Sequence, residues 1–121
     1  ENRFEKLLNE AVSFVKEKNI DKLKIVNLGD SVQGLIHIND FKLNQVPVAD
    51  AITGVSELIA DFLNKLSGYC DVEYNHICFA NHTQIRPLGT KANEVSCEDL
   101  EKVIFKMIKL ALKNIVSYLL Q

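Results

Sequence analysis

Hydrophobic residues recur at helical spacing in three segments of the chain and form two shorter runs between them. Residues 3–18 place apolar side chains at the i, i+3, i+4 spacing of an amphipathic helix, with charged residues largely on the other side. Residues 48–66 repeat this pattern, and residues 97–120 form a longer helical segment that is apolar on most sides, as expected for a buried helix. The run at 22–28 is mostly apolar and predicts a strand covered on both faces, and residues 72–80 predict a second strand.

The predicted order is helix, strand, helix, strand, helix, which indicates an α/β fold with a right-handed βαβ unit at its core. Residues 35–46 read as a loop with a short turn inside, or alternatively as an additional edge strand. Ser96 and Asp99 have the spacing of a capping box at the start of the last helix.

The bulk composition is that of one globular domain covering residues 1–121. A formal net charge of −2 without a long basic run argues against binding nucleic acid by phosphate neutralisation alone, although it leaves room for metal-dependent enzymes. Three cysteines without a CxxC spacing indicate a reduced, cytoplasmic setting. No apolar run approaches the length of a membrane span, and the missing initiator Met suggests a processed product or an excerpt.

The candidate chemistry lies where the two predicted strands end. Asp30 follows the strand at 22–28, and Asn81 and His82 follow the strand at 72–80. If the strands are parallel neighbours, these side chains converge at one edge of the sheet, where open α/β sheets bind ligands. Two plainer interpretations stay open, in which Asp30 only forms a turn and His82 is a surface histidine.

These residues carry a resemblance to a known family. Residues 29–34, Gly-Asp-Ser-Val-Gln-Gly, resemble the second motif of the calcineurin-like metallophosphoesterases, and residues 80–83, Ala-Asn-His-Thr, resemble the third. The stretch Gln-Ile-Arg-Pro-Leu-Gly at 84–89 is similar to phage-type members related to DNA-repair exonucleases. The resemblance covers about residues 21–101 and implies a partial calcineurin-like α/β sandwich.

The resemblance also implies roles for single residues. Asp30 would bridge two divalent metal ions, Asn81 would bind the second ion, and His82 would act as the catalytic residue at the scissile phosphate. Oxygen ligands suit Mn²⁺ or Mg²⁺, with Zn or Fe as alternatives when imidazoles take part. Two such ions about 3.5–4 Å apart would clamp the attacking and leaving oxygens of an in-line displacement.

Further residues could contact a substrate. Arg86 has the planar fork that binds phosphate, or it pairs with an acid such as Glu94. His37 follows the turn at Asp30 and is either a substrate-binding neighbour of the site or a structural residue. His76 lies inside a predicted strand, and we expect it to be structural.

The chain also departs from the family. The family's first motif, Asp-x-His, has no match upstream of Ile25, and its later histidines are absent because no histidine follows His82. We therefore expect this chain to bind metal weakly and to hydrolyse little. The intact parent would cut a phosphoester, with nucleic acid as the expected substrate class and DNA as a candidate. The alternative is a small non-enzymatic interaction module that forms a homo-oligomer through the helix at 97–120.

Overall fold

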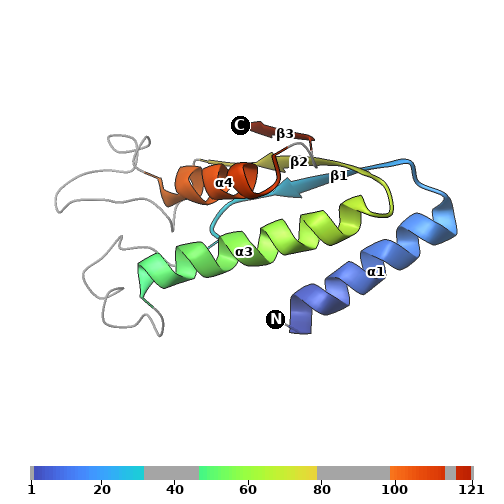
Figure 1. The fold of residues 1–121 in the computed structure, drawn as a ribbon, viewed down its shortest axis with the longest axis horizontal. Helices are drawn as coiled ribbons and strands as arrows, with labels where there is room; N and C mark the ends of the chain where they lie inside the picture. Colours follow the sequence, from blue (N-terminus) through green and yellow to red (C-terminus); the bar gives the residue numbers. More distant parts are fainter. Residues whose placement is uncertain (1, 32–46, 79–98, 114–116, 121) are drawn as a thin grey trace.

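In a computed structural model of the chain, the structure describes residues 2–31, 47–78, 99–113 and 117–120 (Figure 1). The elements are, in chain order, α1 (Asn2–Lys18), β1 (Lys22–Asn27), α3 (Val48–Ser67), β2 (Asp71–His76), α4 (Leu100–Ala111) and β3 (Ser117–Leu120). The α/β class and the βαβ core predicted from the sequence are confirmed, because β1 and β2 are parallel neighbours joined through α3.

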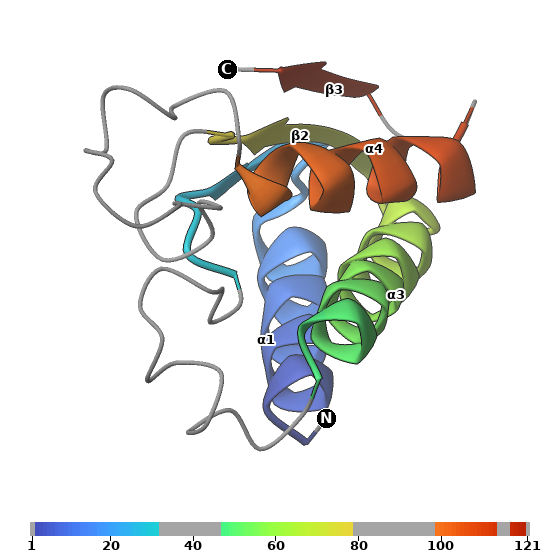
Figure 2. The same cartoon turned by 90° about the vertical axis from the view of Figure 1, so that its left-hand side faces the viewer.

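Within the described residues the sheet has three parallel strands in the order β1-β2-β3. Lys22 pairs with Asp71 at one end of the β1–β2 ladder, and Asn27 pairs with His76 at the other. The helices α1, α3 and α4 lie on one side of this sheet, below the strands in the view of Figure 2. The described part of the chain therefore forms two layers, and a full calcineurin-like sandwich stays a proposal.

The core forms where α3 and α4 pack on the inner face of β2. The periodicity of α3 explains its place, because its buried residues recur every three or four positions and so share one face. The aliphatic and aromatic side chains of α4 meet this face and the inner face of β2. The buried cluster comprises Ile52, Ile59, Ala60, Leu63, Leu66, Val72, Tyr74, Cys78, Ile104, Phe105, Ile108 and Leu112.

The outer face of β1 corrects one prediction. The strand was expected to be covered on both faces, but its residues alternate between exposed and half-buried, and Val26 is 45% exposed. Lys22 and Lys24 share that exposed face, and the Lys24 ammonium lies 3.6 Å from the carboxylate of Glu73 on β2. The prediction followed from the mostly apolar composition of this segment. Its lysines in fact alternate with apolar residues, which is typical of a strand that has one face in solvent.

The last predicted helix is also wrong in part. Instead of one helix over 97–120, α4 ends at Ala111, and β3 occupies Ser117–Leu120 beside β2. Pairing with β3 satisfies backbone groups on the second edge of the central strand, a long-range gain that the helical periodicity does not register. The start differs as well, because α4 is capped by Asp99, whose side chain accepts a hydrogen bond from the Glu101 backbone N–H, and Ser96 lies outside the described residues.

Among the residues that the structure describes, no helix is long and apolar enough to cross a membrane. Cys70 and Cys78 are free thiols, with Cys70 half-buried and Cys78 fully buried. Cys97 lies outside the described residues.

Candidate functional site

The carboxyl ends of β1 and β2 meet at one edge of the sheet. Asn27 and His76 are partners in the ladder, and the backbone N–H of Ile77 donates to the carbonyl of Asn27 at 3.0 Å. The chain therefore leaves both strands at the same place, as the sequence predicted. This is the edge where parallel α/β sheets position ligand-binding residues.

Asp30 lies in a tight turn just past β1. Gly29 and Asp30 have φ angles of 89° and 52°, which lie in the left-handed region that favours glycine. Aspartate is among the few other residues that adopt this region without a large penalty. The side chain of Asn27 stabilises the turn by accepting a hydrogen bond from the Gly29 N–H at 2.9 Å. Asp30 is exposed to solvent.

Beneath this turn lies a cluster of hydrogen-bonded side chains, which we call the strand-end network: Asn27, Ser31, Tyr74, His76 and Glu101. Glu101 and His76 are fully buried, and the Glu101 Oε1 lies 2.6 Å from the His76 Nε2. The same Glu101 oxygen accepts from the Ser31 hydroxyl at 2.7 Å, while Oε2 accepts from the Ser31 backbone N–H at 2.8 Å. The network thus joins the ends of β1 and β2 to the first turn of α4.

The other half of the network runs through Tyr74. Its hydroxyl lies 2.7 Å from the His76 Nδ1 and accepts from the Asn27 side-chain amide at 3.1 Å. The same amide also lies 3.4 Å from the Ser31 hydroxyl, which closes a ring of contacts. Phe105 stacks on the His76 imidazole with ring centroids 5.4 Å apart and so holds its plane.

A count of donors assigns the histidine tautomer. If His76 is neutral with its proton on Nε2, it donates to Glu101, and Nδ1 accepts from the Tyr74 hydroxyl. Each hydrogen bond between these side chains then runs from donor to acceptor in the direction of the Glu101 carboxylate, and each donor that forms one of these bonds has an acceptor. With the proton on Nε2, the donors and acceptors of the network match.

The charge of Glu101 follows from its partners. Burial alone raises the pKa of this carboxyl, but hydrogen bonds from His76 and from the Ser31 side chain and backbone outweigh it, so the pKa lies below its usual value. Glu101 is therefore a buried carboxylate. Burial, with the charges of Glu101 and Asp99, raises the pKa of the Cys78 thiol to about 11, which makes this cysteine a poor nucleophile.

Sequence reasoning found only part of this site. His76 was expected to be structural, and its buried, bonded position confirms that expectation. Glu101 was missed, since it is an ordinary acid in a helical pattern and its partner Ser31 lies 70 positions away. The spacing of Tyr74 and His76 on one face of a strand was an available signal.

Most predicted site residues cannot be placed by this structure. His37, Asn81, His82 and Arg86 all lie outside the described residues. Within the described ranges, no group of three or more His, Cys, Asp or Glu side chains is arranged to hold a metal ion. Asp30 is thus the one predicted site residue whose surroundings the structure describes.

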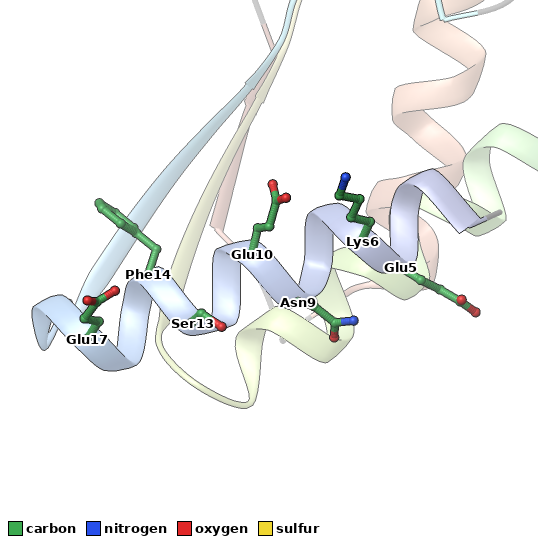
Figure 3. A pocket seen from close by; sticks show the side chains of 7 residues that line it. All are labelled: Glu5, Lys6, Asn9, Glu10, Ser13, Phe14 and Glu17. Carbon is green, nitrogen blue, oxygen red and sulfur yellow. The ribbon is translucent and has the colours of Figure 1, made fainter.

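A separate hollow lies on the surface of α1 (Figure 3). Its described lining comes from that single helix and mixes acidic, basic and amide side chains with one phenylalanine: Glu5, Lys6, Asn9, Glu10, Ser13, Phe14 and Glu17. Ligand sites are generally built from polar groups that converge from several elements. The hollow is therefore an open surface along one side of α1, and the strand ends remain the candidate site.

Comparison with known proteins gives a similar sequence from a prophage. The SPbeta prophage-derived uncharacterized protein YonJ of Bacillus subtilis (strain 168) is 32% identical over 113 residues, covering 93% of this chain. The chain spans only 28% of the length of that relative. No protein-family model matches the chain, and no solved structure matches it.

Proposed function

We propose that this chain forms part of a metal-dependent phosphoester hydrolase that acts on nucleic acid. The observation that carries the proposal is the exposed residue Asp30 in a left-handed turn at the carboxyl end of β1, beside a parallel β2. The two family-like motifs follow these two strands, so the parallel pairing supports a common edge for them. The prophage origin of the similar protein is consistent with the phage-type resemblance.

Asp30 suits a divalent cation for two reasons. Carboxylate oxygen is a hard ligand of the kind that Mn²⁺ and Mg²⁺ prefer, and Zn²⁺ or Fe²⁺ would need imidazole partners in addition. Asp30 is also exposed to solvent, while the adjacent residue Ser31 is bonded to Glu101. A bound metal pair would polarise the phosphoester and supply a hydroxide nucleophile.

The remaining roles follow the resemblance. Asn81 is proposed as the second metal-binding residue, and His82 as the group that delivers a proton to the leaving oxygen. Arg86 is proposed to hold the phosphate and His37 to contact the substrate. We place the protein in the cytoplasm, a proposal that the free thiols of Cys70 and Cys78 support.

The test compares the natural chain with Asp30→Asn. Asparagine tolerates the left-handed conformation as well as aspartate does, so the variant removes the charge and preserves the turn. We expect calorimetry to show weak Mn²⁺ binding that the variant loses, and assays with bis-p-nitrophenyl phosphate and single-stranded DNA to show little turnover by this chain. Asp61→Asn, an exposed site on α3, is the matched control. Binding that Asp30→Asn leaves unchanged would refute the proposal.

A second candidate is self-association through α4. Val103 and Leu110 are 46% and 65% exposed, and with the half-buried Met107 they lie at i, i+4 and i+7 on one face of this helix. An apolar stripe of this kind could meet the same stripe of a second copy. Sedimentation equilibrium of the natural chain and of Leu110→Glu tests it: a dimer that the variant abolishes supports the candidate, and a monomer in both refutes it.

A further inference from the structure

The turn that carries Asp30 depends on a residue far away in the sequence. Two successive residues, Gly29 and Asp30, hold positive φ angles. Such a conformation persists when the surrounding structure fixes it. Asn27 supports the start of the turn through the Gly29 N–H, and Ser31 forms its far side.

Ser31 is held by a single carboxylate at two points. Glu101 accepts from both the backbone N–H and the hydroxyl of Ser31, at 2.8 and 2.7 Å. Two bonds to one rigid group fix the orientation of a peptide as well as its position, and bonds to a charged acceptor are stronger than those between neutral groups. The peptide held in this way comes directly after Asp30.

Glu101 is itself rigid. Its backbone N–H is bound by the Asp99 side chain at 2.9 Å, and its carboxylate is bound by His76 at 2.6 Å. The side chain is fully buried, so it has no solvated alternative position nearby. Burying a carboxylate is costly unless its oxygens are satisfied by hydrogen bonds, and here three donors converge on it.

We infer that Glu101 is a positioning residue, which fixes the turn at Asp30 through Ser31 and so sets the direction of the Asp30 carboxylate. This inference deepens the proposed function and rests on it where metal binding is concerned. Outer partners of metal ligands commonly change metal affinity by about 10–100-fold when they are removed. Glu101 would act one step further out, through the backbone beside the ligand.

Glu101→Gln is the sharpest test, because it changes one acceptor into a donor at almost constant shape. In one orientation of the new amide, its NH₂ group faces the Ser31 N–H and the backbone bond is lost. In the other orientation the amide oxygen keeps the Ser31 N–H, but a neutral acceptor binds it more weakly than the carboxylate does. The control is Ile108→Val, a buried change on the same helix in a side chain that has no hydrogen-bonding group.

Two measurements on the full 121-residue chain separate the outcomes. We expect hydrogen exchange of the Ser31 amide to become at least about tenfold faster in Glu101→Gln and to stay unchanged in Ile108→Val. We expect Mn²⁺ affinity, measured by calorimetry, to fall about tenfold in Glu101→Gln alone.

Unchanged Ser31 exchange in Glu101→Gln would overturn the inference. Faster exchange with unchanged Mn²⁺ affinity would also overturn it, since the turn would then not determine how the Asp30 carboxylate binds the ion. A natural chain that binds no Mn²⁺ would refute the proposed function instead, and the exchange comparison would still decide whether Glu101 fixes the turn.

Discussion

The inner face of β2 changes character along its length. At the amino end, Val72 is buried in the aliphatic cluster formed with α3 and α4. At the carboxyl end, His76 is just as buried but belongs to a network of hydrogen bonds. The first end is held by burial that has no preferred direction, whereas the second is held by bonds with fixed donors and acceptors.

The two ends of β2 therefore contribute differently to the fold. Apolar packing stabilises the domain and tolerates substitutions that conserve volume. A buried polar network adds little stability compared with apolar packing of the same shape, but it determines where particular atoms lie. Asp30 follows β1 at the same edge of the sheet, so the hydrogen-bonded network lies under the candidate site.

The largest loss of stability is expected in the aliphatic cluster at the amino end of β2. Leu66→Ala empties a fully buried position and should lower the free energy of unfolding by about 2–5 kcal/mol. Leu110→Ala, at a position 65% exposed, is the matched control and should change it by less than about 0.5 kcal/mol. Urea denaturation measures both, and equal losses would contradict the assigned core.

At the carboxyl end, Glu101→Gln should cost about 1–3 kcal/mol at neutral pH, since it replaces the charged acceptor of the network by a neutral amide. The pKa of Glu101 is lowered from its ordinary value of 4.5 by folding. Its contribution is therefore complete above that value and is lost as the pH falls through the folded-state pKa.

The difference in unfolding free energy between the natural chain and Glu101→Gln should accordingly shrink below about pH 4.5. Denaturation series at several pH values test this, with the exposed Glu57→Gln as a control. A gap that stays constant down to the acid limit would show that the carboxylate is not ionised in the folded chain.

Tyr74→Phe is expected to have a smaller effect, about 1 kcal/mol. The ring remains packed, but the His76 Nδ1 loses its donor and the Asn27 amide loses an acceptor. Tyr69→Phe, at a half-exposed position, should be neutral. Thermal denaturation compares the two, and a neutral Tyr74→Phe would mean that the hydroxyl contributes nothing to the network.

The smallest effect should come from Asp30 itself. Asp30→Gly removes the strain of the left-handed conformation, which stabilises the folded chain, but it also raises the conformational entropy of the unfolded chain. The two effects should nearly cancel, so the free energy of unfolding should change by less than about 1 kcal/mol. Asp30→Ala should be less stable than Asp30→Gly, because alanine tolerates this φ poorly. The reverse order in urea denaturation would contradict the left-handed turn.

Local patterns predicted much of the architecture. The periodicities of α1 and α3 and the position of β1 agree closely with the structure, since each follows from its own segment. The strand β3 was missed because its formation depends on the free edge of β2 rather than on its own sequence. The βαβ unit was predicted because two strands around one long helix allow few other arrangements.

The candidate site was predicted less completely. Asp30 was found because a Gly-Asp turn after a strand is visible in the sequence. Glu101 and Ser31 meet only after α4 packs on the sheet, and no local signal links residues that far apart. The motif residues after β2 lie outside the described part of the chain, so their roles stay predictions.

A metal site at the strand ends is tested most directly by an NMR titration with Mn²⁺, which broadens amide signals near the bound ion even when binding is weak. We expect the amides of residues 29–31 and 81–82 to broaden together and first, and those of Leu23 and Val72 at the amino ends of the strands to be spared. Asp30→Asn should abolish the effect. Broadening centred on acidic residues of α1, or persisting in Asp30→Asn, would contradict a metal site at the strand ends.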